Sequence, residues 1–337
     1  MADMPPTRPS QAPSSMHWLT RPAAALAWIG RQGTRAVAFS IFAGLALPPL
    51  AALFKPAFTP SLFALLCLAF LRVDPAELRA HAARPGLVLA ATAWIMIAAP
   101  LACGLLLAAF GISAAPGLYL ALIFQAIAPP VTSSPALAAL MGLDGALALA
   151  TFAVCAAAAP ATTALFAALF LGPAAPVSAL GLGLRLFGLL AGAAAAAALV
   201  RRLAGQAWVE RQAERIDGLS VIALFVFAVA VMDGVLAQAV ARPVMVLGLV
   251  GLAFATSLGL AVLTAAVFAR AGRSAALTLA VSAGLRNMGL MVAAAAGLVP
   301  DLTWLYVAIM QFPVYLLPHV VKRRLARDGK IGTRSDV

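Results

Sequence analysis

Charged side chains are scarce in this sequence, and acidic ones are the scarcest. Only 10% of the 337 residues are charged, with 23 Lys and Arg against 11 Asp and Glu, whereas 64% are hydrophobic. A typical soluble domain has about 25% charged and about 45–50% apolar residues. A water-soluble fold of this length could not bury so much apolar surface. The composition therefore excludes an ordinary soluble protein and predicts an all-α integral membrane protein.

Residues that carry out catalysis or bind metals are also few. The interiors of the apolar runs hold one Asp and no Glu, and one histidine, His319, lies near an end. This set offers no paired carboxylates, histidine cluster or nucleophile with a base. Cys67, Cys103 and Cys155 all fall inside apolar segments, where a thiol behaves as a small core residue. We therefore predict no enzymatic activity, no cofactor and no metal site.

The apolar residues form about ten runs, most of them about 18–25 residues long, which is the length that a bilayer of about 30 Å requires of a helix. Short segments rich in Pro, Gly and Arg separate them. We predict spans over residues 37–54, 58–71, 86–110, 117–141, 145–171, 177–200, 216–238, 243–268, 274–297 and 302–320.

The basic residues predict the orientation of these spans. The formal net charge of +12 is compatible with nucleic-acid binding. However, Lys and Arg lie between the apolar runs rather than in a stripe on one face, so we predict the lipid bilayer as the partner and no nucleic acid. With the N-terminus inside, only Lys55 and Arg242 fall outside, and Arg185 and Arg286 lie within spans. The positive-inside rule then places both termini in the cytoplasm, as expected for a multi-pass protein of the bacterial inner membrane.

Ten crossings divide into five and five. Because five is odd, the two halves face opposite ways, as do the inverted repeats of secondary transporters. We predict a first repeat over residues 37–171 and a second, inverted repeat over residues 172–320. A disordered Pro- and Ser-rich tail with a segment suited to the membrane interface covers residues 1–36, and a basic cytoplasmic tail covers residues 321–337.

The fourth span of each half is interrupted by polar residues, prolines or glycines. Proline lacks the N–H that a continuous helix needs, and free carbonyls at membrane depth are tolerated only where protein or water pairs with them. Two breaks that meet at mid-depth would form a polar cavity for a solute. The predicted helix breaks are Pro129, Pro130, Pro135, Gly284 and Gly289. The predicted substrate-binding residues are Gln125, Thr132, Ser133, Ser134, Ser282, Arg286 and Asn287. The alternative is that these hydroxyls bond back to their own helices and that the prolines are ordinary kinks.

Several of these segments resemble the bile acid:sodium symporter family. Residues 71–85 (LRVDPAELRAHAARP), followed by an apolar span ending near Pro100, are similar to the second loop and third span of that family. Pro129, Thr132 and Ser134 match its first crossing helix, and Gly284, Asn287, Gly289 and Leu290 match its second. The resemblance covers about residues 37–320. It implies a panel domain and a core domain, with spans four and nine crossing in the core, and alternating transport of organic anions, usually with sodium.

The departures from that family concern its sodium ligands. Sodium-coupled members have a glutamate and, four residues on, a glutamine in the second crossing helix, where this chain has Ser282 and Arg286. Pro135 replaces an asparagine, and a glutamine ligand of the third span falls near Ile95. Sodium needs several oxygen ligands with some net negative charge, and a fixed guanidinium repels it. We therefore predict that sodium coupling is absent and that Arg286 replaces the coupling cation.

Arg286 is also suited to binding a carboxylate, sulfonate or phosphate of the substrate. Asp233 is the only acidic residue in the interior of a predicted span, since Asp217 lies at the first turn of the same span. We expect it either to form a switchable charge pair with Arg286 or to be solvated near the outer surface. A structural ion pair is the plainer alternative for Arg286.

The predicted function is secondary transport of a small organic anion. A non-transporting membrane sensor on the same scaffold and a proton-linked efflux carrier, such as one of the auxin-efflux type, remain alternatives. An arsenite exporter is disfavoured, because residues 125–138 contain no cysteine.

Overall fold

The computed structural model describes residues 33–73, 85–172 and 177–327. Over these residues the secondary structure is helical apart from one isolated β-bridge. Most of the predicted tail over residues 1–36, the loop within residues 71–85 and the last part of the basic tail lie outside the described residues.

The helices in chain order are α2 (Gly33–Ala46), α3 (Pro48–Phe54), α4 (Phe58–Arg72), α6 (Pro85–Ala93), α7 (Ala99–Ala109), α8 (Pro116–Ile127), α9 (Ser134–Leu140), α10 (Gly145–Phe170), α11 (Ala179–Ala204), α12 (Gln206–Arg211), α13 (Ala213–Val231), α14 (Val235–Ala241), α15 (Pro243–Val267), α16 (Arg273–Gly284), α17 (Met288–Ala294), α18 (Asp301–Ile309) and α19 (Gln311–Arg327). A π-helical segment, Trp94–Ala98, joins α6 to α7, and a 3-10 turn η1 (Lys55–Ala57) joins α3 to α4.

Six helical stretches of the described chain are long and apolar enough to cross a membrane. They are Pro48–Arg72, Pro85–Ala109, Gly145–Phe170, Ala179–Ala204, Ala213–Ala241 and Pro243–Val267. The chain is therefore a multi-pass membrane protein. The other predicted spans contain shorter helices, which leaves the count of ten and the inverted repeat as predictions.

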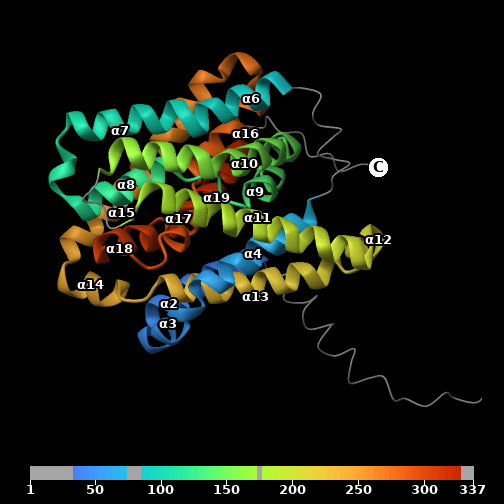
Figure 1. Ribbon diagram of the computed structural model, residues 1–337, viewed down its shortest axis with the longest axis horizontal. Helices are drawn as coiled ribbons and strands as arrows, with labels where there is room; N and C mark the ends of the chain where they lie inside the picture. Colours follow the sequence, from blue (N-terminus) through green and yellow to red (C-terminus); the bar gives the residue numbers. More distant parts are fainter. Residues whose placement is uncertain (1–32, 74–84, 173–176, 328–337) are drawn as a thin grey trace, which may run out of the picture.

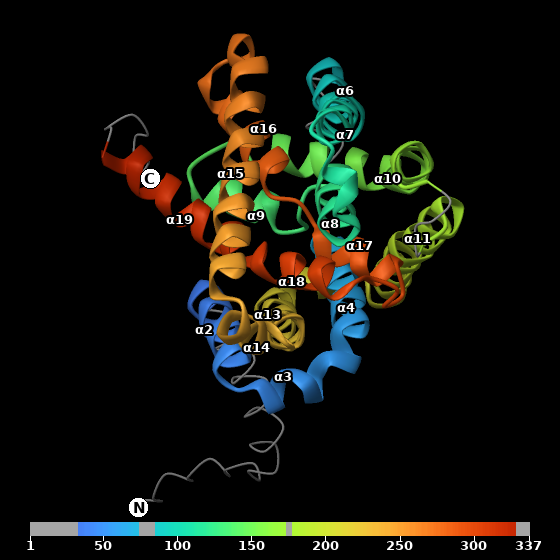
Figure 2. The ribbon, with the colours of Figure 1, turned by 90° about the vertical axis from the view of Figure 1, so that its left-hand side faces the viewer.

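Two sets of helices correspond to the panel and core domains that the family resemblance implies, and α10 and α11 pack closely against each other between the two sets. Helices α2, α4, α11 and α13 pack side by side and are called here the panel helices. Helices α6 to α10 and α15 to α19 are called the core helices. Figure 1 shows α10, α11 and α13 running along the long axis of the molecule. Figure 2 views the molecule from one end, with α2, α4 and α13 below and α6, α7, α15 and α16 above.

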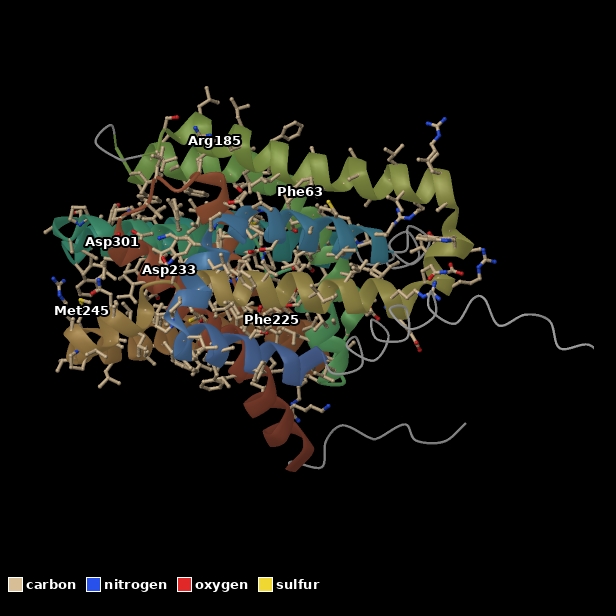
Figure 3. All side chains as sticks on the ribbon, turned by 90° about the horizontal axis from the view of Figure 1, so that it is seen from below. Phe63, Arg185, Phe225, Asp233, Met245 and Asp301 are labelled. Carbon is tan, nitrogen blue, oxygen red and sulfur yellow. The ribbon has the colours of Figure 1, made fainter. Side chains whose placement is uncertain are left out.

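One end of the panel is held together by polar contacts. Arg201 of α11 donates to the carbonyls of Phe70 and Val73 at the end of α4, at 2.9 and 2.8 Å. Arg72 of α4 forms an ion pair with Asp217 of α13 at 3.2 Å. This is called the Arg201 end. The opposite end, at which Asp233 and Asp301 are labelled in Figure 3, is called the Lys55 end.

Candidate functional site

The two interrupted helices pair with each other through their backbones. The first break separates α8 from α9, and the second separates α16 from α17. The Val131 N–H donates to the Leu285 carbonyl and the Asn287 N–H donates to the Pro129 carbonyl, both at 2.9 Å. Pro130 and Arg286 thereby form an isolated antiparallel bridge. This meeting point of the broken helices is called the crossing, and in Figure 2 the helices α8, α9 and α17 around it lie toward the centre of the view.

The first break follows from its two adjacent prolines. Ala128 precedes Pro129 and is extended, with φ −63° and ψ 142°, because a residue before proline disfavours the helical region. Pro130 likewise has no N–H with which to continue α8. Both prolines therefore lie at the interruption between α8 and α9.

The other three predicted breaks lie beside the interruptions. Pro135 is in the first turn of α9, where a missing N–H costs little. Gly284 is the last residue of α16, and a Cβ there would lie 2.8 Å from the Ser257 carbonyl of α15. Gly289 is inside α17, where a Cβ would lie 2.8 Å from the ring of Phe227. The two glycines permit close helix contacts, and all three residues flank the interruptions, so their role in breaking the helices stays a prediction.

Arg286 is buried at the crossing, with 2% of its surface exposed. Its Nη1 donates to the Ala128 carbonyl at 2.8 Å, and Nη1 and Nη2 both donate to the Ile95 carbonyl at 3.2 Å. Its Nε has no partner among the described residues. Two backbone carbonyls thus hold the charge, and no carboxylate of the described chain is within 4.0 Å of it.

Both of these carbonyls lack a helical partner for a reason that the sequence explains. In the π-helical segment the Ala99 N–H donates to Trp94, so it is not available to Ile95. The next candidate for Ile95 is residue 100, a proline without an N–H. The Ala128 carbonyl lies at the end of α8, where no further turn follows. A cation is also favoured there by the helix dipole.

Asp233 lies far from this arrangement. Helix α13 ends at Val231, and Gly234 turns the chain with φ +77°. Asp233 therefore sits in a turn at the Lys55 end, where its Oδ2 lies 2.8 Å from Nζ of Lys55. The predicted charge pair between Asp233 and Arg286 is not present among the described residues, because the Asp233 carboxylate pairs with Lys55 and the Arg286 guanidinium donates to two backbone carbonyls.

The residues predicted to bind substrate differ in whether their polar atoms already have hydrogen-bond partners within the protein. Ser282 Oγ donates to the Thr278 carbonyl of its own helix at 3.1 Å. Asn287 Oδ1 accepts from the Leu290 N–H at 3.2 Å and so caps α17. Ser134 Oγ is buried without a partner in the described chain. Thr132 and Ser133 are half-buried. Their predicted contact with a substrate stays a prediction.

Gln125 belongs to a buried network that the sequence did not predict. Its Nε2 donates to Thr256 Oγ1 at 2.9 Å, and its Oε1 accepts from the Tyr306 hydroxyl at 2.8 Å. The network joins α8, α15 and α18. The only sequence signal is a polar side chain in the middle of each of these apolar segments.

Removing this network should destabilise the protein. Gln125→Leu leaves the hydroxyls of Thr256 and Tyr306 without this partner, and we expect it to lower the free energy of unfolding by about 1–3 kcal/mol. Gln311→Leu is the matched control, since Gln311 donates only to Val307 of its neighbouring turn. Thermal unfolding in detergent measures both variants. Equal stability of the two variants would show that the network is not structural.

Two cavities lie outside the crossing itself. One of about 370 Å³ is at the Lys55 end, lined by apolar residues that include Gly44, Met232 and Val240. The other, of about 40 Å³, is lined by residues of α15, α16 and α19 together with Met141 and Leu285. The smaller cavity borders the crossing, because Leu285 precedes Arg286.

A sodium ion does not fit the residues at this position. The carbonyls of Ile95 and Ala128 already accept hydrogen bonds from Arg286, and the nearest groups supply no negative charge. An ion placed about 4 Å from a guanidinium would be repelled by about 4 kcal/mol at an effective dielectric constant of about 20.

Comparison with known proteins finds a family to which the chain is similar. The model of the sodium bile acid symporter family matches residues 59–242, which is more than half of the chain. The matched region includes the first broken helix and ends before Arg286. None of the curated proteins matches the chain.

Proposed function

The chain belongs to the sodium bile acid symporter family, and on this basis we propose that it carries a small organic anion across the membrane without sodium coupling. Members of this family are membrane transporters rather than enzymes. In this proposal Arg286 is a fixed cation that replaces the coupling ion.

The observation that carries the proposal is the bonding of Arg286. Its guanidinium donates to two carbonyls that have no helical partner, one in the third predicted span and one at the end of α8. A bound cation would stabilise the same two carbonyls and the same crossing. The guanidinium is covalently attached, so it stabilises the carbonyls without dissociating. Transport then does not depend on sodium.

The charge of the crossing also supports an anionic substrate. The guanidinium is not neutralised by a carboxylate among the described residues, so the crossing has a positive potential that favours an anion. We propose that the substrate binds beside the guanidinium, in contact with Thr132, Ser133 and Ser134. In this proposal Ser282, Asn287 and Gln125 lie near the substrate without touching it directly. Both terminal nitrogens of Arg286 already donate to carbonyls, so in this proposal a direct hydrogen bond to the anion comes from Nε, which has no partner among the described residues.

The topology supports a specific orientation for this carrier. Arg72, Arg201, Arg202 and Arg215 lie at the Arg201 end, whereas Lys55 and Arg242 lie at the other. We propose that the Arg201 end and both termini face the cytoplasm and that the membrane is the bacterial inner membrane. The repeats over residues 37–171 and 172–320 would then be inverted, with the panel and core helices moving relative to each other.

Flux in proteoliposomes tests this proposal. We expect saturable counterflow of radiolabelled taurocholate or benzoate, with the same rate when choline replaces sodium. A rate that falls more than about tenfold in choline would contradict the absence of sodium coupling. Binding of both anions without counterflow would favour a sensor, and uptake only under an imposed pH gradient would favour a proton-linked carrier.

A further inference from the structure

A cluster of three side chains joins the panel helices to the core helices at the Lys55 end. Nζ of Lys55, in η1, lies 2.8 Å from Oδ2 of Asp233 and 5.3 Å from the ring centroid of Trp304. The Trp304 Nε1–H donates to the Asp233 backbone carbonyl at 3.2 Å. Lys55 and Asp233 adjoin the panel helices α4 and α13, whereas Trp304 is on α18 of the core.

Aromatic residues extend this contact toward the crossing. The ring of Phe58 on α4 lies 5.1 Å from that of Trp304 and 5.2 Å from that of Phe227 on α13. Phe227 in turn contacts Gly289 of α17, the half-helix that begins at the crossing. Aromatic packing therefore continues from the polar cluster to the crossing and closes the panel against the core on this side.

The polar contacts at the Arg201 end have a different arrangement. The ion pair between Arg72 and Asp217, and the bonds from Arg201 to the end of α4, join panel helices to one another. They can therefore persist when the panel moves relative to the core. The cluster at the Lys55 end cannot persist, because Trp304 would have to leave both Lys55 and Asp233.

We propose that Lys55, Asp233 and Trp304 form a latch that holds the Lys55 end closed and that opens when the carrier takes up its anion from that side. This inference rests on the proposed transport function. Asp233 has 21% of its side chain exposed and Lys55 has 54%, so water can replace the contacts and the latch can open reversibly. Losing the ion pair and the cation–π contact should raise the ratio of open to closed molecules by roughly three- to tenfold.

The test measures the opening of the Lys55 end without any transport. Spin labels are attached at Leu53 on α3 and at Leu298 before α18, which are 70% and 51% exposed. The labels are placed in a chain whose Cys67, Cys103 and Cys155 are replaced by alanine, in nanodiscs without substrate. We expect Lys55→Ala and Asp233→Asn each to increase a longer-distance population by roughly three- to tenfold. Arg242→Ala and Asp301→Asn are matched controls, because they make the same charge changes at exposed residues of the same end.

The swapped pair Lys55→Asp with Asp233→Lys should shift the distances back toward those of the parent chain. The latch is refuted if both single variants keep the parent distance distribution, or if the controls shift it equally. If Lys55→Ala does not fold, Lys55→Gln makes the same test. The distance measurement needs no flux, so it is independent of the transport assay. A distance shift in a chain that does not transport supports the latch and contradicts only the proposed carrier function. Transport without a distance shift supports the carrier function and contradicts the latch.

Discussion

Arg286→Met should abolish transport and lower the stability of the protein. The substitution leaves the buried carbonyls of Ile95 and Ala128 without their donors. Each unpaired buried acceptor costs about 1–3 kcal/mol, and membrane-depth carbonyls have no water to replace the donor. The combined loss is a large part of a total stability of about 5–15 kcal/mol. Thermal unfolding in detergent and anion counterflow measure the two effects.

Two further variants separate the causes of this effect. Arg286→Lys keeps the charge but not the planar fork that reaches both carbonyls, so its stability and flux should fall between those of the parent and Arg286→Met. Arg185→Met is the matched control, because Arg185 is exposed on α11 and forms no hydrogen bond or ion pair with the described residues. If Arg286→Met were as stable as Arg185→Met, the guanidinium would not hold the crossing together.

Gly289→Ala should slow transport by about tenfold. The added Cβ would lie 2.8 and 2.9 Å from two ring carbons of Phe227, whose ring is itself stacked on Phe58. The ring cannot move away freely, so the overpacking should cost about 1–3 kcal/mol, and it falls at the contact between panel and core. Counterflow rates measure this loss.

A second substitution should restore the function of that variant. Phe227→Leu in the Gly289→Ala background removes the ring atoms that clash and should recover most of the rate. Gly188→Ala is the control, since nothing lies within 4 Å of the added Cβ. A double variant that transports no better than Gly289→Ala would show that the clash with Phe227 is not the cause.

The parts of the site that could be predicted are those that follow from the covalent structure of single residues. Pro129 and Pro130 interrupt α8 whatever surrounds them, so the first break could be read directly from the sequence. The burial of Arg286 was also predictable, because a lone guanidinium within an apolar span must face the protein interior. The free carbonyl of Ile95 depends on the π-helical segment before Pro100, which the sequence did not predict, and nothing in the sequence indicated that Arg286, 191 residues away, would bind it.

The side-chain contacts that the sequence did not predict depend on where helices end and on how they pack. The partner of Asp233 depends on where α13 ends. The turn at Gly234 places the Asp233 carboxylate beside Lys55. The sequence is compatible with a hydrogen bond from Ser282 to a substrate or to its own helix, and in the structure its hydroxyl donates to the Thr278 carbonyl of its own helix. Gln125 forms hydrogen bonds with Thr256 and Tyr306, which lie on helices more than a hundred residues away in the sequence. Predictions of this kind require the packing of the helices.

If Arg286 acts as a fixed cation in place of sodium, a sodium titration of thermal stability tests this role most directly. The double variant Ser282→Glu with Arg286→Gln introduces the residue types that sodium-coupled relatives have at these positions, while freeing the carbonyls of Ile95 and Ala128. We predict that sodium, and not choline, raises the unfolding temperature of this variant by several degrees and leaves that of the parent chain unchanged. A parent chain stabilised by sodium, or a double variant indifferent to it, would contradict the account.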